Sequence, residues 1–186
     1  MKAEGDQDLI RRIAARDQTA MTTLYARHHV RLYRYLVRLT RNEAVAEELM
    51  NETFLETWRK AGSYEGRSAV STWLFSIGHN RAISSMRKRG ESQLDEDAAA
   101  EIADQDDNAE IALQKRGKAD VMRRCMDRLT VDHKAVIDLV YYHDKSVAEV
   151  AALLAIPENT VKTRMFYARK KLAELMREAG LDRGWP

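Results

Sequence analysis

The chain has 186 residues, of which 45% are hydrophobic and 32% are charged, with only two prolines and eight glycines. This composition is typical of a mostly helical globular protein with one or two domains, long enough to bury a hydrophobic core. No apolar run approaches the roughly 20 residues that a membrane-spanning helix needs. The polar N-terminal residues also lack the apolar region of a signal peptide. We therefore expect a cytoplasmic protein without membrane insertion.

The net charge of +2 hides three segments of different charge. Residues 1–89 hold 16 Lys and Arg against 10 Asp and Glu, a balance of +6. Residues 90–114 hold nine acidic residues and no basic one, and residues 115–186 hold 15 basic against 10 acidic residues, a balance of +5. The pattern predicts two basic domains, 1–89 and 115–186, joined by an acidic linker of residues 90–114 that is flexible or only partly helical.

The sequence offers little for catalysis or metal binding. Cys125 is the only cysteine, so an internal disulfide and a thiolate cluster are both excluded, and we expect a buried thiol on a helix. His28 and His29 are adjacent and point to different faces, and no HExxH motif is present. No paired-carboxylate or nucleophile motif stands out. We therefore expect no catalytic residue, no metal and no cofactor.

Two helices are predicted at the N-terminus. Asp6 or Asp8 can cap a first helix that ends near Arg16. Asp17 can cap a longer second helix, in which apolar side chains recur at helical spacing as far as Leu39.

A third helix is predicted near residues 43–60. Its apolar arc is wide, and its remaining face surrounds Leu55 with polar side chains. A single exposed Leu needs no functional explanation, but a Leu ringed by polar residues is also how a partner-binding anchor looks. Both interpretations stay open from this helix alone. The face presents Glu48, Asn51, Glu52, Leu55, Glu56 and Arg59.

A turn at residues 62–68 leads into a helix predicted for residues 70–88. This helix is apolar on more sides than a surface helix should be. Polar residues lie among its aromatic side chains, and it ends in basic residues. Aromatics beside a basic groove suit the stacking of unpaired bases. The alternative is that Trp73 and Phe75 belong to the core.

Helices near residues 110–129 and after Thr130 are predicted before the most informative stretch, residues 146–172. Ser146 and Glu149 have the spacing of a capping box and predict a helix that ends near Leu154. Pro157 suits the first turn of the next helix. We expect the tail after Gly180 to be loosely ordered.

The helix after Pro157 carries one apolar stripe, formed by Val161, Met165, Ala168, Leu172 and Leu175. Its other sides are polar and basic, with a single acid, Glu158, between Pro157 and Ala173. Two short helices joined by a tight turn are typical of a helix-turn-helix motif. The second helix of this motif enters the major groove of DNA. A solvated basic face on an ordinary helical hairpin is the alternative. The candidate DNA-facing residues are Asn159, Thr160, Lys162, Thr163, Arg164, Phe166, Tyr167, Arg169 and Lys170.

With both domains described, the chain resembles the extracytoplasmic-function (group IV) sigma factors of bacterial RNA polymerase. Four segments carry the resemblance in family order: the opening DLIRRIAARDQTAMTTLYARHHVRLYRYLVRL, then VAEELMNETFLETWRK, YEGRSAVSTWLFSIGHNRAISSMRKR and IPENTVKTRMFYARKKL. The chain departs from the family at Val45, commonly Asp, at Asn51, commonly Gln, and at Ala155, often Gly.

The resemblance implies an all-α fold with a region-2-like bundle at residues 1–89 and a region-4-like helix-turn-helix at residues 115–186. It implies an alternative sigma factor of a stress response, controlled by an anti-sigma factor, with core RNA polymerase and promoter DNA as partners. The second domain would bind the duplex minus-thirty-five element through the DNA-facing residues above. The third helix would bind core polymerase through Glu48, Asn51, Glu52, Leu55 and Arg59. The acidic linker would occupy the polymerase channel.

The first domain would capture the melted non-template strand of the minus-ten element. The residues implied are Ser63, Tyr64, Arg67, Ser68, Ser71, Thr72, Trp73, Phe75 and Asn80.

Two other functions fit parts of the sequence less well. A free-standing helix-turn-helix regulator would bind duplex DNA by itself, usually as a dimer, but the chain shows no dimerisation heptads and such a regulator needs no acidic linker. An all-helical enzyme using His or Glu is the weaker alternative, because His79, His133 and His143 are scattered along the chain.

Overall fold

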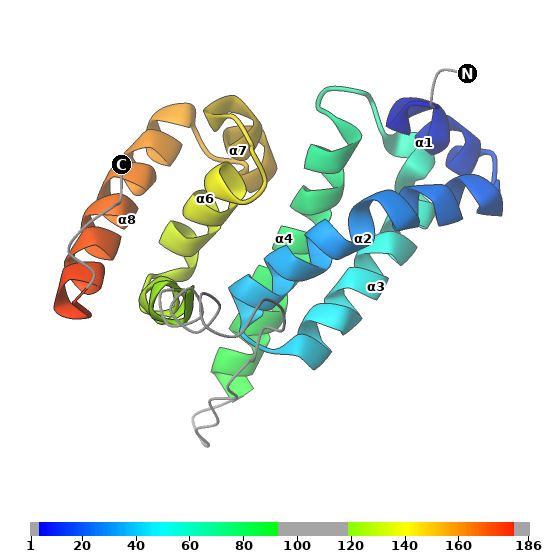
Figure 1. Ribbon diagram of the computed structural model, residues 1–186. Coiled ribbons are helices and arrows are strands. Elements are labelled where there is room, and N and C mark those ends of the chain that lie inside the picture. The colour runs from blue at the N-terminus through cyan, green and yellow to red at the C-terminus, as the bar shows by residue number, and fades with distance from the viewer. Residues whose placement is uncertain (1–3, 93–118, 181–186) are drawn as a thin grey trace, which may run out of the picture. The chain divides into compact units, whose positions relative to one another are not determined.

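The structure is a computed structural model that describes residues 4–92 and 119–180. Every regular element in these two ranges is helical, as predicted (Figure 1). Contacts group the helices into two compact units. One contains α1 to α4 and α7, and the other contains the helix at residues 119–127, α6 and α8. The predicted acidic linker lies outside the described residues apart from residues 90–92, which belong to α4, and the tail after Gly180 also lies outside them.

The first unit begins with α1 (Asp6–Ala14) and α2 (Gln18–Thr40). The Asp17 side chain accepts hydrogen bonds from the amides of Thr19 and Ala20, so the predicted cap of α2 is confirmed. The predicted cap of α1 is wrong. Gly5 occupies that position without a side-chain bond, because the Asp6 carboxylate instead accepts hydrogen bonds from Arg27 and His28 of α2, at 2.8 and 2.7 Å.

Helices α3 (Glu43–Lys60) and α4 (Val70–Ser92) complete the bundle with α2. Asn42 caps α3 by accepting a hydrogen bond from the Val45 amide at 3.0 Å. Two threonines of α3, Thr53 and Thr57, are fully buried, and each hydroxyl donates to the carbonyl four residues earlier. Buried polar side chains are tolerated in a helix when such bonds satisfy them. These two positions therefore extend the buried face of α3 beyond its apolar residues.

The core of this unit has two regions. Near α1, a cluster of buried residues is flanked by half-buried Trp58 and Trp73. Further along α2, the ring of Tyr35 is fully buried and lies 5.5 Å from the Phe75 ring of α4, centroid to centroid. The Tyr35 hydroxyl and Nδ1 of His79 are 2.7 Å apart. The buried cluster near α1 comprises Leu9, Ile10, Ile13, Ala20, Leu24, Ala61 and Val70.

In the second unit, the helix at residues 119–127 ends near the predicted position, and its predicted start lies outside the described residues. Thr130 caps α6 (Val131–Tyr141), as predicted, by accepting a hydrogen bond from the His133 amide. Helix α6 packs against α8 (Glu158–Glu178). Cys125 is buried, as predicted, and burial raises the pKa of its thiol.

Candidate nucleic-acid and polymerase interfaces

Helix α8 has the two faces that the sequence predicts. Its apolar stripe is buried, with Val161, Ala168 and Leu172 fully so. Because this stripe anchors the helix on its own unit, the opposite side faces solvent. The exposed residues there are Asn159, Lys162, Thr163, Phe166, Tyr167, Arg169 and Lys170. Thr160 and Arg164 are half-buried at its edge.

Two aromatic side chains project from the exposed side of α8. Phe166 is 59% exposed and Tyr167 is 55% exposed, and their rings meet edge to face with centroids 5.4 Å apart. Lys162, Arg169 and Lys170 form no ion pair with the described carboxylates. A helix surface that combines unpaired cations, amide and hydroxyl groups and apolar contacts matches the groups that base edges and phosphates offer in the major groove.

One side chain of this surface has a partner that the sequence did not reveal. Nη2 of Arg164 lies 2.8 Å from Oδ2 of Asp132 in the first turn of α6. Asp132 and Arg164 are 32 positions apart, so no local spacing could have indicated the pair. The Thr163 hydroxyl donates to the Asn159 carbonyl at 2.9 Å within the helix.

The turn before α8 is left-handed at a residue other than glycine. Helix α7 (Val147–Leu154) begins directly after Ser146, as predicted, and buries Val150, Ala151 and Leu153. Ala155 follows with φ +54°, and the Ile156 amide donates to the Ala151 carbonyl at 3.1 Å. This is the Schellman arrangement that ends many helices, usually with glycine at the left-handed position.

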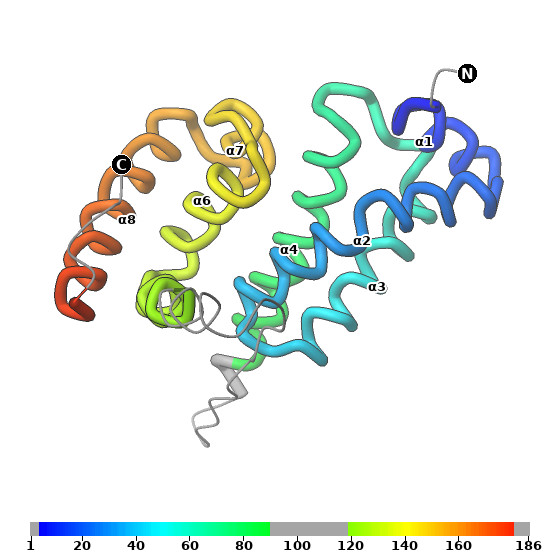
Figure 2. The backbone as a smooth tube through the Cα atoms, in the orientation of Figure 1, coloured from blue at the N-terminus to red at the C-terminus, as the bar shows by residue number. Residues whose placement is uncertain are grey.

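The connection between α3 and α4 forms the second candidate surface. It consists of a short 3-10 helix, η1 (Ala61–Ser63), and an open arc up to residue 69 (Figure 2). The Tyr64 ring packs against the Trp73 ring, with centroids 5.1 Å apart, and its hydroxyl donates to the Ser68 carbonyl. Gly66 adopts φ +71°, where glycine carries no steric cost. Ser63 and Arg67 are exposed at the tip.

The structure divides the candidate minus-ten residues of α4. Trp73 and Ser71 are half-buried and Asn80 is exposed. Phe75 is only 2% exposed, because it packs on Tyr35, and Thr72 is only 1% exposed. A ring so enclosed has no free face for a base, so the core interpretation holds for Phe75. We leave Phe75 and Thr72 out of the proposed surface.

The third surface is the outer face of α3. Leu55 is 55% exposed. Around it, Glu48, Asn51 and Arg59 are also exposed, whereas Glu52 is half-buried. The helix phase predicted from the sequence is therefore confirmed, and Leu55 lies outside the core.

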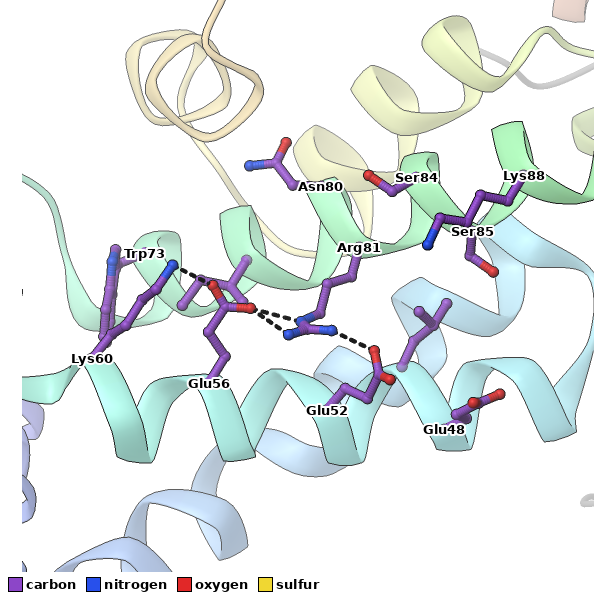
Figure 3. A pocket seen from close by; sticks show the side chains of 12 residues that line it. Glu48, Glu52, Glu56, Lys60, Trp73, Asn80, Arg81, Ser84, Ser85 and Lys88 are labelled. Atoms are coloured by element: carbon purple, nitrogen blue, oxygen red, sulfur yellow. Dashed lines mark hydrogen bonds and ion pairs between the residues drawn. The ribbon is translucent and has the colours of Figure 1, made fainter.

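A groove of about 570 Å³ separates this face from α4, and Arg81 bridges it (Figure 3). Arg81 Nε donates to Oε2 of Glu56 at 2.7 Å, and Nη1 donates to Glu52. Lys60 Nζ donates to the other oxygen of Glu56 at 2.7 Å. The hydrogen bonds from Lys60 and then Arg81 hold the pKa of Glu56 below its ordinary value of 4.5. Two acids of the α3 face thus have cations of their own chain as partners.

Within the described ranges, no group of three His, Cys, Asp or Glu side chains is arranged to hold a metal ion. Among the helices described, none is long and apolar enough to cross a membrane.

Comparisons with known proteins agree with this geometry. The models of Sigma-70 region 2 and Sigma-70 region 4 match residues 24–91 and 119–172. The ECF RNA polymerase sigma factor SigL of Mycobacterium tuberculosis is 32% identical, covering 91% of this chain and 96% of that protein. The RNA polymerase sigma-H factor of Pseudomonas aeruginosa is 28% identical, covering 95% of this chain and 98% of that protein.

The fold has solved counterparts. The sigma factor RpoE of Bartonella quintana, in complex with the anti-sigma factor NepR, superposes with a TM-score of 0.71 at 24% identity, covering 87% of this chain and 98% of that one. The fold, with two helical regions and an exposed basic face on α8, is that of a sigma factor. The chain belongs to the ECF family of RNA polymerase sigma factors.

Proposed function

We propose that this chain is an alternative sigma factor that works as a transcription initiation factor in the cytoplasm, where it directs core RNA polymerase to specific promoters. The match to SigL over nearly the whole length of both chains carries this proposal. The family membership also argues against an enzyme and against a free-standing regulator. The three surfaces can be assigned to the three tasks that a sigma factor performs.

Helix α8 is the proposed reader of the duplex minus-thirty-five element. Its exposed Asn159, Lys162 and Lys170 suit base edges and phosphates, and a good side-chain contact to a base contributes about 1–3 kcal/mol of discrimination.

The arc between α3 and α4, with Asn80, is the proposed site for the melted minus-ten element. Exposing a base costs a few kcal/mol, and stacking on an aromatic ring returns about 1–3 kcal/mol per base. We propose Trp73 and Tyr64, which are half-buried and pack against each other, as the aromatic rings that provide that stacking.

The outer face of α3 is the proposed contact with core polymerase, with Leu55 as its apolar anchor. The B. quintana protein is held by an anti-sigma factor, and we extend this mode of control, in a stress response, to the present chain. An anti-sigma factor that covers the α3 face would compete directly with polymerase.

Gel filtration of the full chain with purified bacterial core RNA polymerase tests this assignment. We expect the wild-type chain to co-elute with core and Leu55→Asp to lose most of that binding while keeping its helical circular dichroism. Val30→Asp is the matched control, since Val30 is also apolar and 45% exposed but lies on α2. It should bind like the wild type.

Absence of co-elution for the wild-type chain would refute the sigma assignment. Equal binding by Leu55→Asp would refute the proposed contact surface alone.

A further inference from the structure

The ion pair between α6 and α8 concerns a residue outside every surface assigned above. Asp132 is the second residue of α6, and its carboxylate reaches Arg164 on the edge of the recognition helix. The side chain of Arg164 is 27% exposed and that of Asp132 is 56% exposed. An ion pair this open to solvent contributes little to stability, so holding the two helices together is a poor explanation for it.

The Arg164 guanidinium has donors beyond the one that pairs with Asp132. Its shortest contact with the carboxylate is through Nη2, and a guanidinium has five N–H donors in a rigid plane. Nε and Nη1 carry three of them. Thr160 and Tyr167 lie one turn before and after Arg164 on the same flank of α8. Arg164 is therefore held by an ion pair at the edge of the surface that is proposed to face DNA.

We propose that Asp132 is a positioning residue for promoter recognition, which fixes Arg164 so that its remaining donors meet the edge of one base pair in the minus-thirty-five element. The inference rests on the proposed function of α8. A free arginine loses much rotamer freedom when it binds a base, and a guanidinium already held in place loses less. A bidentate contact from arginine to guanine depends on orientation as well as on charge.

The carboxylate of Asp132 should also weaken binding to DNA duplexes that lack the promoter sequence. It is a negative charge beside the proposed DNA surface, so it repels the phosphate backbone of every duplex alike. A correct base pair offsets that repulsion through Arg164, and an incorrect one does not. Asp132 thus raises the difference between correct and incorrect sites by disfavouring the incorrect ones, which is a recognised route to specificity.

The test uses holoenzyme reconstituted from the full chain and core polymerase. Duplexes are first selected from a randomised library by the wild-type holoenzyme, and each position of the upstream element is then replaced by the other three bases. Binding to every duplex is measured for the wild type, Asp132→Asn, Arg164→Ala and the double variant. Asp120→Asn is the matched control, because Asp120 is 50% exposed and pairs with Arg123 within its own helix.

We expect Asp132→Asn to lower discrimination at one base pair by about threefold or more, a part of the discrimination that a bidentate arginine contact provides. Binding to unrelated duplexes should rise in the same variant. In the Arg164→Ala background, the effect of Asp132→Asn on base preference should disappear, since it acts through the guanidinium. Asp120→Asn should retain the base preferences of the wild type.

Unchanged base preferences in Asp132→Asn would overturn the inference while leaving the sigma assignment intact. So would a change of the same size with and without Arg164. If the wild-type holoenzyme selects no sequence at all, the proposed function fails and the inference falls with it.

Discussion

The turn between α7 and α8 places an alanine where the backbone favours glycine, and Ala155→Gly should stabilise the protein. The left-handed conformation at φ +54° costs a residue with a Cβ roughly 1–2 kcal/mol. Glycine removes that cost but adds about 0.4–1 kcal/mol of conformational entropy to the unfolded chain. Ala155 is exposed, so its methyl group loses no packing. The net gain should be about 0.5–1 kcal/mol.

Ala152→Gly is the matched control, because Ala152 is also exposed but lies inside α7. There glycine should cost about 1 kcal/mol. Guanidinium unfolding of the wild type and both variants, followed by circular dichroism at 222 nm, gives the two changes. They should have opposite signs. If both variants are destabilised by similar amounts, Ala155 does not carry left-handed strain and the reasoning is wrong.

Two further predictions concern the first unit. Glu56 has a lowered pKa in the folded protein, so the stability that it adds is present above pH 4.5 and lost as the pH falls through the lower folded value. The stability difference between wild type and Glu56→Gln should therefore shrink as the pH falls below 4.5, and a constant difference would contradict the pairing. Tyr35→Phe removes the buried bond to His79 and should cost about 1–2 kcal/mol, measured by urea unfolding. Tyr33→Phe, which loses no such bond, should stay within about 0.5 kcal/mol of the wild type.

Local sequence patterns were sufficient to predict where the helices lie and which face of each helix is buried. Hydrophobic periodicity predicted the buried stripe of α8 and the exposure of Leu55. The residue types that precede the helices predicted Asp17 and Thr130 as caps. Each of these features depends on residues within two turns of one another, so the sequence contains the information directly. The predicted domain limits, linker and individual binding roles remain predictions.

Interactions between side chains of different helices could not be predicted from local sequence patterns. Asp6 or Asp8 was expected to cap α1, but the partners of Asp6 in α2 are 21 and 22 residues away. The Arg81 bridge to Glu52 and Glu56 likewise spans 29 and 25 residues. Phe75 could equally have stacked on a base or packed in the core, because an aromatic side chain suits both. In each case the deciding partner lies on another helix, and only the tertiary structure identifies it.

The groove bridged by Arg81 has a consequence for how the two kinds of binding respond to salt. A basic partner that approaches Glu52 and Glu56 displaces the protein's own guanidinium and ammonium groups, so it releases few bound ions into solution. Lys162, Arg169 and Lys170 of α8 form no ion pair with the described carboxylates, and contact with DNA releases the counterions condensed on its phosphates. If polymerase binds at the proposed α3 face, rising ionic strength should therefore weaken promoter binding steeply and leave the polymerase contact at these two acids comparatively unchanged.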